Sequence, residues 1–355
     1  MNKLSPVDCH CQPARRGFLT GLLGLGAAAA LPGCASPDAK PAAMALPSRI
    51  DTHHHCFSPA YVAELDKLGQ APPIVKNWSL NKTLDDMAKA GVATSIVSVT
   101  TPQVGVFDGP NAKRIARECN EYAARLGQDH KGRFGSFAML PMQDTDGALR
   151  EMEYALDVLK ADGICLLTSY GDKWLGHAQF KPVMDELNRR KAILYTHPTV
   201  ANCCRAVLTP EVPPTVIEFG TDTTRTITDI VFSGTAARCP DVRFIFSHAG
   251  GTLPFLTERL MKMPVLDPKL VARVPRGVLF ELQRFYYDTA WSAHPGALAS
   301  LMQLVKVSQV LFCSDYPYRT GEDHVKGLIA YGYSEADLKA IGRDNAVRLM
   351  PQWKA

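Results

Sequence analysis

Three consecutive histidines, His53, His54 and His55, close a short apolar run that begins at Arg49. In an extended strand, successive side chains point to opposite faces, so His53 and His55 would share one face and His54 would occupy the other. Imidazole nitrogens are common ligands of divalent first-row metals, so this pair could hold a metal ion. The alternative is a histidine cluster on the surface, and only partners elsewhere in the chain decide between the two.

Further residues with this chemistry lie at the ends of other apolar runs. His197, His248 and Asp315 each follow or end such a run, as His53 and His55 do. If each run is a strand of one barrel, all five residues lie at the carboxyl ends of strands, where barrel enzymes place their active sites. Histidines together with a carboxylate suit Zn2+ or another first-row divalent ion that keeps an open position for water or substrate.

The elements that must position these residues are short strands alternating with helices. Runs too short for a helix but suited to buried strands cover residues 49–55, 94–100, 133–140, 162–169, 192–197, 243–248, 285–290 and 310–315. Apolar residues at three and four spacing predict helices over residues 80–90, 111–129, 147–161, 180–191, 225–238, 252–263 and 296–307. This α/β alternation favours a single (β/α)8 TIM barrel, with a doubly wound open sheet as the alternative.

The composition is that of an ordinary globular protein. The chain has 355 residues, of which 46% are hydrophobic and 21% charged, and its formal net charge is +4. Part of this charge lies in the N-terminal region, so the rest of the chain is nearly neutral. A nucleic acid is therefore not expected as a partner.

The first 34 residues predict a targeting segment rather than part of the fold. Arg15 and Arg16 precede an apolar stretch over residues 18–31, a pattern that resembles a twin-arginine export signal. The stretch is too short and too rich in Gly and Ala for a stable membrane span, although a retained anchor is the alternative. The expected location of the mature protein is therefore the periplasm.

Residues 31–34 resemble a lipobox, in which Cys34 would become the lipid-anchored first residue. Cleavage after Ala35 or Ala45 would instead release the protein from the membrane. Residues 35–47, rich in Ala and Pro, predict a flexible tether, and residues 48–355 the folded barrel. A lipid anchor at Cys34 is thus the only membrane contact that we expect.

The cysteines of the mature chain indicate neither a disulfide framework nor a zinc–thiolate site. They form no C-x-x-C pair and lie mostly within apolar runs, which predicts buried thiols. The adjacent Cys203 and Cys204 are the exception. They are interpreted as a pair of loop thiols, with a redox switch as the alternative.

In combination, these residues resemble the amidohydrolase superfamily, and within it the amidohydrolase-related decarboxylases typified by aminocarboxymuconate semialdehyde decarboxylase. Residues 167–171 and 222–225 look closest to the 6-methylsalicylate decarboxylase-like branch. The resemblance covers about residues 48–350. It rests on Asp51, His53 and His55, on His197-Pro198, on His248-Ala249-Gly250-Gly251, on Tyr287-Asp288-Thr289, on Ser314-Asp315-Tyr316-Pro317, and on Asn345-Ala346 with Arg348-Leu349.

The resemblance implies a role for each strand-end residue. His53, His55, His197 and Asp315 match the metal ligands of the family, and His248 matches a histidine that lies beside the metal and handles protons. One divalent ion is expected, either Zn2+ or Mn2+. The fourth predicted strand, residues 163–167, contains no lysine, so the carbamylated lysine of the binuclear amidohydrolases has no candidate.

Arg259 adds a residue from outside the strand ends. It lies eleven residues after His248, where the similar decarboxylase branch has an arginine that crosses a dimer interface and holds the substrate carboxylate. The resemblance therefore implies a homodimer. The alternative is an exposed arginine on the surface of the predicted helix over residues 252–263.

The implied reaction is the non-oxidative decarboxylation of a small hydroxyaromatic or related unsaturated carboxylic acid. Carbon dioxide can leave only if the ring carbon is protonated, and Asp315 with His248 is the expected acid. A metal-dependent hydrolase acting on a lactone or an amide is the alternative, because the same residues can activate water. A binding protein without catalysis is the second alternative. Deamination is not expected, because the acids that deaminases place near the equivalent histidines are missing.

Overall fold

The computed structural model describes residues 48–205, 209 and 211–354, so the predicted signal segment and tether lie outside the described residues. The centre of the fold is an eight-stranded parallel sheet, and each of its strands falls within or overlaps one of the predicted runs. In sheet order, the strands are β1 (Arg49–His55), β2 (Val92–Ser98), β3 (Phe134–Met139), β4 (Gly163–Leu167), β7 (Ile193–His197), β8 (Arg243–Phe246), β9 (Tyr286–Asp288) and β10 (Val310–Leu311).

Backbone hydrogen bonds between the first and last strands close this sheet into a barrel. The Thr52 amide donates to the Phe312 carbonyl at 3.1 Å, and the Asp315 amide donates to the His53 carbonyl at 2.8 Å. The last strand is only two residues long, but the amides of Ser314 and Asp315 still bind β1, and the Cys313 amide binds Thr289 after β9. The predicted (β/α)8 barrel is confirmed.

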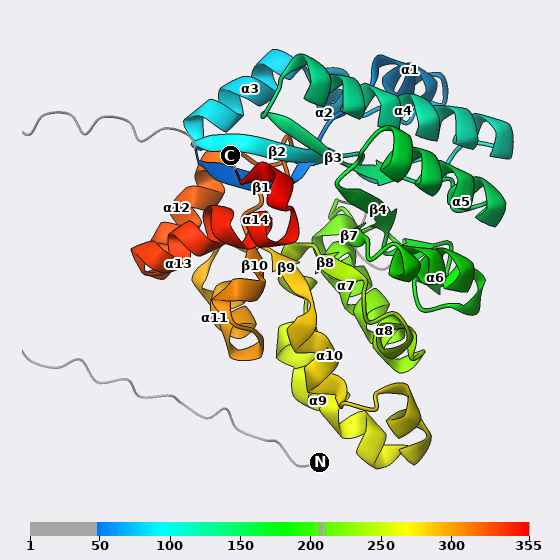
Figure 1. Cartoon of the computed structure of the whole chain (residues 1–355), viewed down its shortest axis with the longest axis vertical. Helices are drawn as coiled ribbons and strands as arrows, with labels where there is room; N and C mark the ends of the chain where they lie inside the picture. The colour runs from blue at the N-terminus through cyan, green and yellow to red at the C-terminus, as the bar shows by residue number, and fades with distance from the viewer. Residues whose placement is uncertain (1–47, 206–208, 210, 355) are drawn as a thin grey trace, which may run out of the picture. The chain divides into compact units, whose positions relative to one another are not determined.

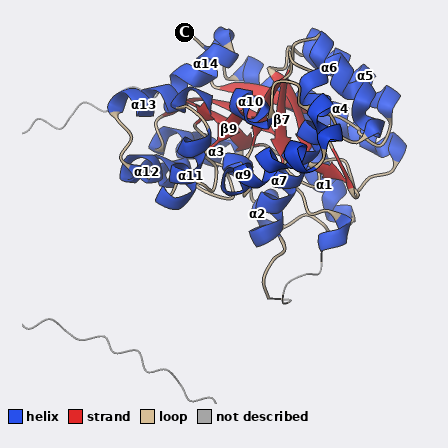
Figure 2. Cartoon of the chain, turned by 90° about the horizontal axis from the view of Figure 1, so that it is seen from below, coloured by secondary structure: helices blue, strands red, loops and turns tan. Residues whose placement is uncertain are grey.

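Helices pack around the strands, as Figures 1 and 2 show, and each predicted helix is present. The largest difference concerns the helix predicted over residues 225–238: α7 begins at Thr215 and ends at Phe232, and Gly234, with a φ of 78°, separates it from the short α8. The boundaries of the other predicted helices differ by a few residues. The helices at the predicted positions are α3 (Leu80–Lys89), α4 (Gly109–Asp129), α5 (Thr145–Glu153), α6 (Lys181–Arg189), α7 (Thr215–Phe232), α8 (Thr235–Arg238), α9 (Leu253–Leu266) and α11 (Pro295–Leu304).

Further helices lie in connections where the sequence analysis predicted none. They include the segment between β1 and β2 and the residues after β10, where α12 begins with Thr320 capping the Asp323 amide. A helix at the end of the chain covers one end of the barrel core. These helices are α1 (Pro59–Lys67), α2 (Pro73–Lys76), α10 (Val278–Arg284), α12 (Gly321–Tyr331), α13 (Glu335–Lys339) and α14 (Asn345–Leu349).

The barrel interior is a packed core rather than a channel. Ile50, Phe137, Tyr195 and Leu311 come from four different strands, and each is at most 2% exposed. Such a core holds the strands in a fixed register, so the residues at their carboxyl ends have fixed relative positions. The interior therefore acts as the rigid base of the site described below.

The cysteines behave largely as predicted. All described cysteines are free thiols, and each is buried except Cys203. The Cys203 and Cys204 sulfurs lie 2.6 Å apart in the loop after β7. Across the described residues, we find no helix that combines the length and the apolar character needed to cross a membrane.

Candidate metal centre

The four residues predicted as metal ligands come together at the carboxyl end of the barrel. One nitrogen each of His53, His55 and His197 and one oxygen of Asp315 lie within 4.8 Å of one another, and all four residues are buried. They come from β1, from the end of β7 and from the segment after β10. His54 points to the opposite face, as predicted, where its ring stacks on Tyr316 with centroids 4.9 Å apart.

The hydrogen bonds of the three histidines prepare them to bind a cation. The Nδ1 atom of His53 lies 2.8 Å from Asp288 Oδ2, that of His55 lies 3.2 Å from the Ser98 carbonyl oxygen, and that of His197 lies 2.8 Å from the Pro198 carbonyl oxygen. Carbonyl and carboxylate oxygens only accept, so each Nδ1 carries the proton. In the neutral rings, each Nε2 therefore carries a lone pair, as ligation of a metal requires. The lone pair of His197 Nε2 faces the Thr100 hydroxyl at 3.2 Å.

These lone pairs are close to one another. The Nε2 atoms of His53 and His55 lie 3.1 Å apart, and Asp315 Oδ1 lies 3.1 Å and 2.8 Å from them. Acceptor atoms repel one another at such distances unless a proton or a cation lies between them. Imidazole nitrogens with one carboxylate are also ligands that zinc and manganese accept, so the residues present fit a divalent ion.

Burial and the neighbouring charges shift the pKa values of the residues in this cluster. Burial lowers the pKa of His53, but the carboxylates of Asp315 and Asp288 outweigh it and raise the value to about 10. Burial raises the pKa of Asp315, but His53, His248 and His55 hold it well below its ordinary value. Burial, His55 and His53 hold the pKa of His197 well below its ordinary value. A cation would thus displace one proton, that of the His53 imidazolium.

His248 lies beside this cluster rather than within it. Its Nε2 atom is 3.4 Å from Asp315 Oδ2, close enough for an ion pair, but this buried nitrogen makes no hydrogen bond with any described residue. The ring stacks on Phe219 of α7, with an interplanar angle of 7°. The structure therefore places His248 next to Asp315, with an unbonded ring nitrogen facing that carboxylate.

The backbone at these positions is strained. His248, Ala249 and Asp315 have φ values of 55°, 56° and 60°, in the left-handed region that residues other than glycine rarely adopt. Each such residue costs roughly 1–3 kcal/mol and persists only when its surroundings hold it. The His248 amide donates to Asp288 Oδ1 at 2.7 Å, and the Asp315 amide donates to the His53 carbonyl at 2.8 Å.

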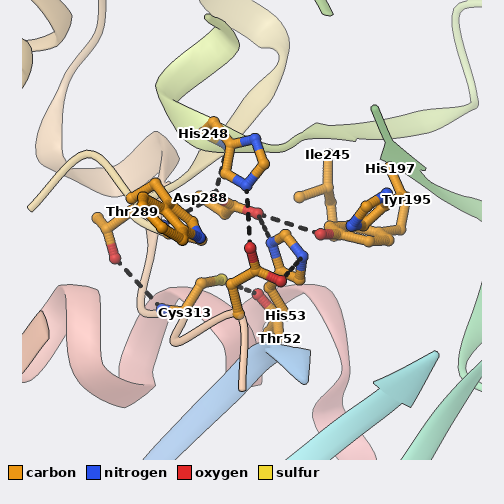
Figure 3. A network of polar contacts seen from close by, with 12 residues as sticks. Thr52, His53, Tyr195, His197, Ile245, His248, Asp288, Thr289 and Cys313 are labelled. Carbon is orange, nitrogen blue, oxygen red and sulfur yellow. Dashed lines mark hydrogen bonds and ion pairs between the residues drawn. The ribbon is translucent and has the colours of Figure 1, made fainter. Parts of the chain in front are cut away.

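Asp288, to which the sequence analysis assigned no role, holds two residues of the candidate site. Its Oδ2 atom accepts from His53 Nδ1, and its Oδ1 atom accepts from the amides of His248 and Ala290 at 2.7 and 3.0 Å (Figure 3). The Tyr195 hydroxyl also donates to Oδ2, at 3.3 Å. One carboxylate thus orients a predicted metal ligand and the neighbouring His248. The available signal was the Tyr287-Asp288-Thr289 motif of the resemblance.

Asp51 makes a similar link between the two ends of the barrel sheet. Its Oδ1 atom accepts from the amides of His53 and Ser314, both at 3.1 Å. Its Oδ2 atom accepts from the Ser314 hydroxyl at 2.5 Å. Because Asp51 joins β1 to the residue before Asp315, it fixes the distance between the histidines of β1 and the carboxylate.

Arg259 lies apart from the cluster, on α9. Its side chain is exposed and has no hydrogen bond or ion pair with any residue of the described chain. On the same helix, Leu253 and Leu260 are buried against the barrel of their own chain, as the alternative reading of this helix expects. Arg259 does not contribute to the site of its own chain.

Comparisons with known proteins give the family of this fold and site. A family model described as amidohydrolase matches residues 50–351. Decarboxylase yanB of Aspergillus niger is 37% identical over 325 residues, which cover 86% of this chain and 88% of that protein. The 6-methylsalicylic acid decarboxylase of Penicillium expansum is 34% identical over 316 residues, with 86% and 97% covered.

Solved structures agree on the fold. An amidohydrolase II structure is 25% identical with a TM-score of 0.79, and it covers 86% of this chain and 100% of that one. The 2,6-dihydroxybenzoate decarboxylase from Rhizobium is 22% identical with a TM-score of 0.75, and it covers 86% and 99%. Together with the family match and the curated relatives, this confirms the resemblance found in the motifs. The chain belongs to the amidohydrolase family.

Proposed function

We propose that this protein is a metal-dependent, non-oxidative decarboxylase of a small hydroxyaromatic or related unsaturated carboxylic acid. One observation carries the proposal: three imidazole nitrogens and the Asp315 carboxylate converge in a buried cluster with His248 beside it. The names of the curated relatives support the reaction class. Their similarity extends over the whole barrel, so the substrate class of 6-methylsalicylate is the first to test.

The residues of this chain suit the proton transfer that decarboxylation needs. As the bond between the ring carbon and the carboxylate breaks, its electron pair stays with the ring and a proton must reach that carbon. Asp315 is ionised in the metal-free site, so it must first receive a proton. His248 Nε2, at 3.4 Å from Asp315 Oδ2, is placed to exchange that proton with it.

We propose His53, His55, His197 and Asp315 as ligands of one divalent ion. When bound, such an ion would act as a Lewis acid that orients the substrate carboxylate or a neighbouring hydroxyl. Zn2+ is the first candidate because it accepts this ligand set, and Mn2+ is the second. A dihydroxybenzoate decarboxylase of Polaromonas of the same fold has been solved with bound manganese.

A cavity of about 280 Å³ near the loop after β7 has the character that an aromatic acid requires. Its walls include apolar side chains such as Leu167 and Tyr170, and its charged side chains are Lys173 and Arg205, with no acidic residue among them. None of the cluster residues lines this cavity; Thr199, two residues after His197 in the sequence, does. An anionic aromatic molecule would meet both apolar surface and positive charge there.

We further propose that the active unit is a homodimer in which Arg259 of one chain completes the site of the other. Support comes from α9, where Phe255 is 85% exposed and Val265 and Leu266 are 76% and 75% exposed. Exposed apolar side chains gathered on one helix favour a protein partner. An unpaired Arg259 on the same helix could then bind the substrate carboxylate with two parallel hydrogen bonds.

Carbon dioxide release tests the proposed reaction. Metal-loaded protein is incubated with a panel of hydroxybenzoates, 6-methylsalicylate among them, and with small lactones and amides. We expect stoichiometric carbon dioxide and decarboxylated arene from at least one acid. Hydrolysis of a lactone or an amide without carbon dioxide would replace the proposal with the alternative hydrolase.

Residues 1–34 carry a separate proposal, that the chain is exported by a twin-arginine-like signal to the periplasm and is lipid-anchored at Cys34. The motif at Arg15 and Arg16 and the lipobox-like residues 31–34 support it. Replacing both arginines with lysine should keep the protein in the cytoplasm. Incorporation of a labelled fatty acid should be lost in Cys34→Ala, and an unlabelled wild-type protein would contradict the anchor.

A further inference from the structure

Residues 167–171 and 222–225, the two stretches that resemble the 6-methylsalicylate decarboxylase-like branch, contact each other around the buried carboxylate of Asp222. Asp222 of α7 is fully buried, and its Oδ2 atom accepts from the hydroxyls of Thr168 at 2.5 Å and Ser169 at 2.8 Å. Its Oδ1 atom accepts from the indole N–H of Trp174 at 2.6 Å. Burial raises the pKa of Asp222, while these three donors oppose that rise and favour the carboxylate.

Thr168 connects this carboxylate to the loop that carries His197. Its hydroxyl has one proton, which it gives to Asp222, so its oxygen lone pairs remain free to accept. That oxygen accepts from the Thr199 amide at 3.2 Å, while the Thr168 amide donates to the His197 carbonyl at 2.9 Å. Thr168 therefore binds the His197–Thr199 segment at two points.

The peptide unit between Pro198 and Thr199 continues the path. Its N–H is the group that donates to Thr168, and its carbonyl oxygen accepts from Nδ1 of His197 at 2.8 Å. Each donor in the path points toward Asp222: the His197 ring N–H to the peptide carbonyl, the peptide N–H to the Thr168 hydroxyl, and that hydroxyl to the carboxylate. Hydrogen bonds aligned in this way polarise one another.

We infer that Asp222 is a positioning residue for the metal centre, acting on His197 through Thr168 and the Pro198–Thr199 peptide. Metal-binding histidines usually donate directly to a carboxylate or a carbonyl, which fixes the ring and raises its basicity. Here the carbonyl is itself polarised by a buried carboxylate two hydrogen bonds away. The inference rests on the proposed metal site, but not on which reaction that site catalyses.

The competing explanation is that Asp222 only anchors the hairpin of β5 (Ser169–Tyr170) and β6 (Lys173–Trp174) to α7. The chain offers variants that separate the two roles. Thr168→Val keeps the side-chain shape but removes the link to Thr199, and Thr168→Ser restores the hydroxyl. Ser169→Ala and Trp174→Phe each remove a donor to the same carboxylate without touching the path to His197.

Asp222→Asn tests the charge itself. The indole N–H of Trp174 keeps the amide oxygen at the Oδ1 position, so the amide NH2 replaces Oδ2 and faces the Thr168 hydroxyl. That hydroxyl must then accept from the amide and turn its proton away from residue 222. The Thr199 amide then donates to a hydroxyl that is no longer polarised by a carboxylate, with little change in side-chain volume.

The measurement is the rate at which Zn2+ leaves metal-loaded protein into an excess of a chromogenic chelator. Thr168→Val and Asp222→Asn should release the ion on the order of tenfold faster than wild type, the lower end of the effect of losing an outer hydrogen-bond partner. Thr168→Ser, Ser169→Ala and Trp174→Phe should release it at the wild-type rate. The visible spectrum of Co2+-loaded protein should shift only in the first two variants.

Thermal unfolding of the metal-free proteins completes the test. If Thr168→Val and Ser169→Ala lower the melting temperature alike and neither changes Zn2+ release, Asp222 is an anchor and the inference is overturned. If Thr168→Val does not fold, the rate of Zn2+ release from Asp222→Asn decides between the two explanations. The proposed reaction is tested independently, because carbon dioxide release by the wild type is not part of this comparison. A wild-type chain that binds no Zn2+, Co2+ or Mn2+ overturns both.

Discussion

Substituting Asp288 with asparagine should disable the metal centre through a single change of proton position. Oδ1 of Asp288 accepts from the amides of His248 and Ala290, so the amide oxygen of asparagine must stay there. The NH2 group then replaces Oδ2 and faces His53 Nδ1, 2.8 Å away. Two donors cannot share that contact, so the neutral ring must move its proton to Nε2, the atom that should bind the metal.

The expected loss of metal affinity is at the upper end of what hydrogen-bond partners of metal ligands contribute. Losing such a partner typically lowers metal affinity 10- to 100-fold, and here a repulsive contact replaces a charge-assisted one. We therefore expect about 100-fold weaker binding, equivalent to ~2.7 kcal/mol. Chelator competition at fixed pH measures the affinity, and circular dichroism checks that the barrel is folded.

Asp162→Asn is the matched control. Asp162 precedes β4 at the opposite end of the barrel, where its carboxylate accepts from the Ser136 amide at 2.7 Å and from Trp353 at 2.8 Å. The same chemical change there should affect stability but leave metal affinity as in wild type. A folded Asp288→Asn protein that binds metal as tightly as the Asp162→Asn control would refute the proton-position argument.

Three further predictions concern protons, turnover and assembly. Because the pKa of metal-free His53 is raised to about 10, the ring is protonated at neutral pH and metal binding should release about one proton there, with affinity rising as pH rises toward 10. Calorimetry in buffers of different ionisation enthalpy measures this release, and none at neutral pH would contradict the assignment. Asp315→Asn should abolish turnover with the fold intact; near-normal turnover in a metal-loaded variant would remove Asp315 from the mechanism. Arg259→Ala should lose roughly 2–5 kcal/mol of substrate stabilisation if the arginine reaches the partner's site. Mixed with Asp315→Asn chains, it should regain about a quarter of wild-type activity, since half of the dimers are hetero and each has one intact site. No recovery despite heterodimer formation would contradict a shared site.

The sequence alone determined the barrel and most of the cluster, because both follow from local patterns. Strands buried on two faces must be short apolar runs, and polar residues can end them only where the chain leaves the core. His197, His248 and Asp315 stood out for that reason. The period of two in an extended strand also separated His53 and His55 from His54 before any contact was known.

Other parts of the site depend on contacts between residues distant in sequence, which no local pattern contains. The barrel closes because β1 and the segment after β10 exchange backbone hydrogen bonds, which brings His55 within 2.8 Å of Asp315. Asp288 lay within a predicted strand and a motif of the resemblance, and only the fold places its carboxylate against His53. The sequence could not predict the proton positions on the histidine rings either, because they depend on which oxygen atom each ring nitrogen contacts.

Asp222 shows the limit most clearly. In the sequence Asp222 lies three residues before the helix predicted over residues 225–238, whereas the structure places it within α7, which begins at Thr215. Only packing of α7 against the residues after β4 buries its carboxylate beside Thr168, where its hydrogen bonds come from neighbouring side chains. Residue type and spacing identify groups that can do chemistry, but burial and long-range partners decide the charge and orientation in which they do it.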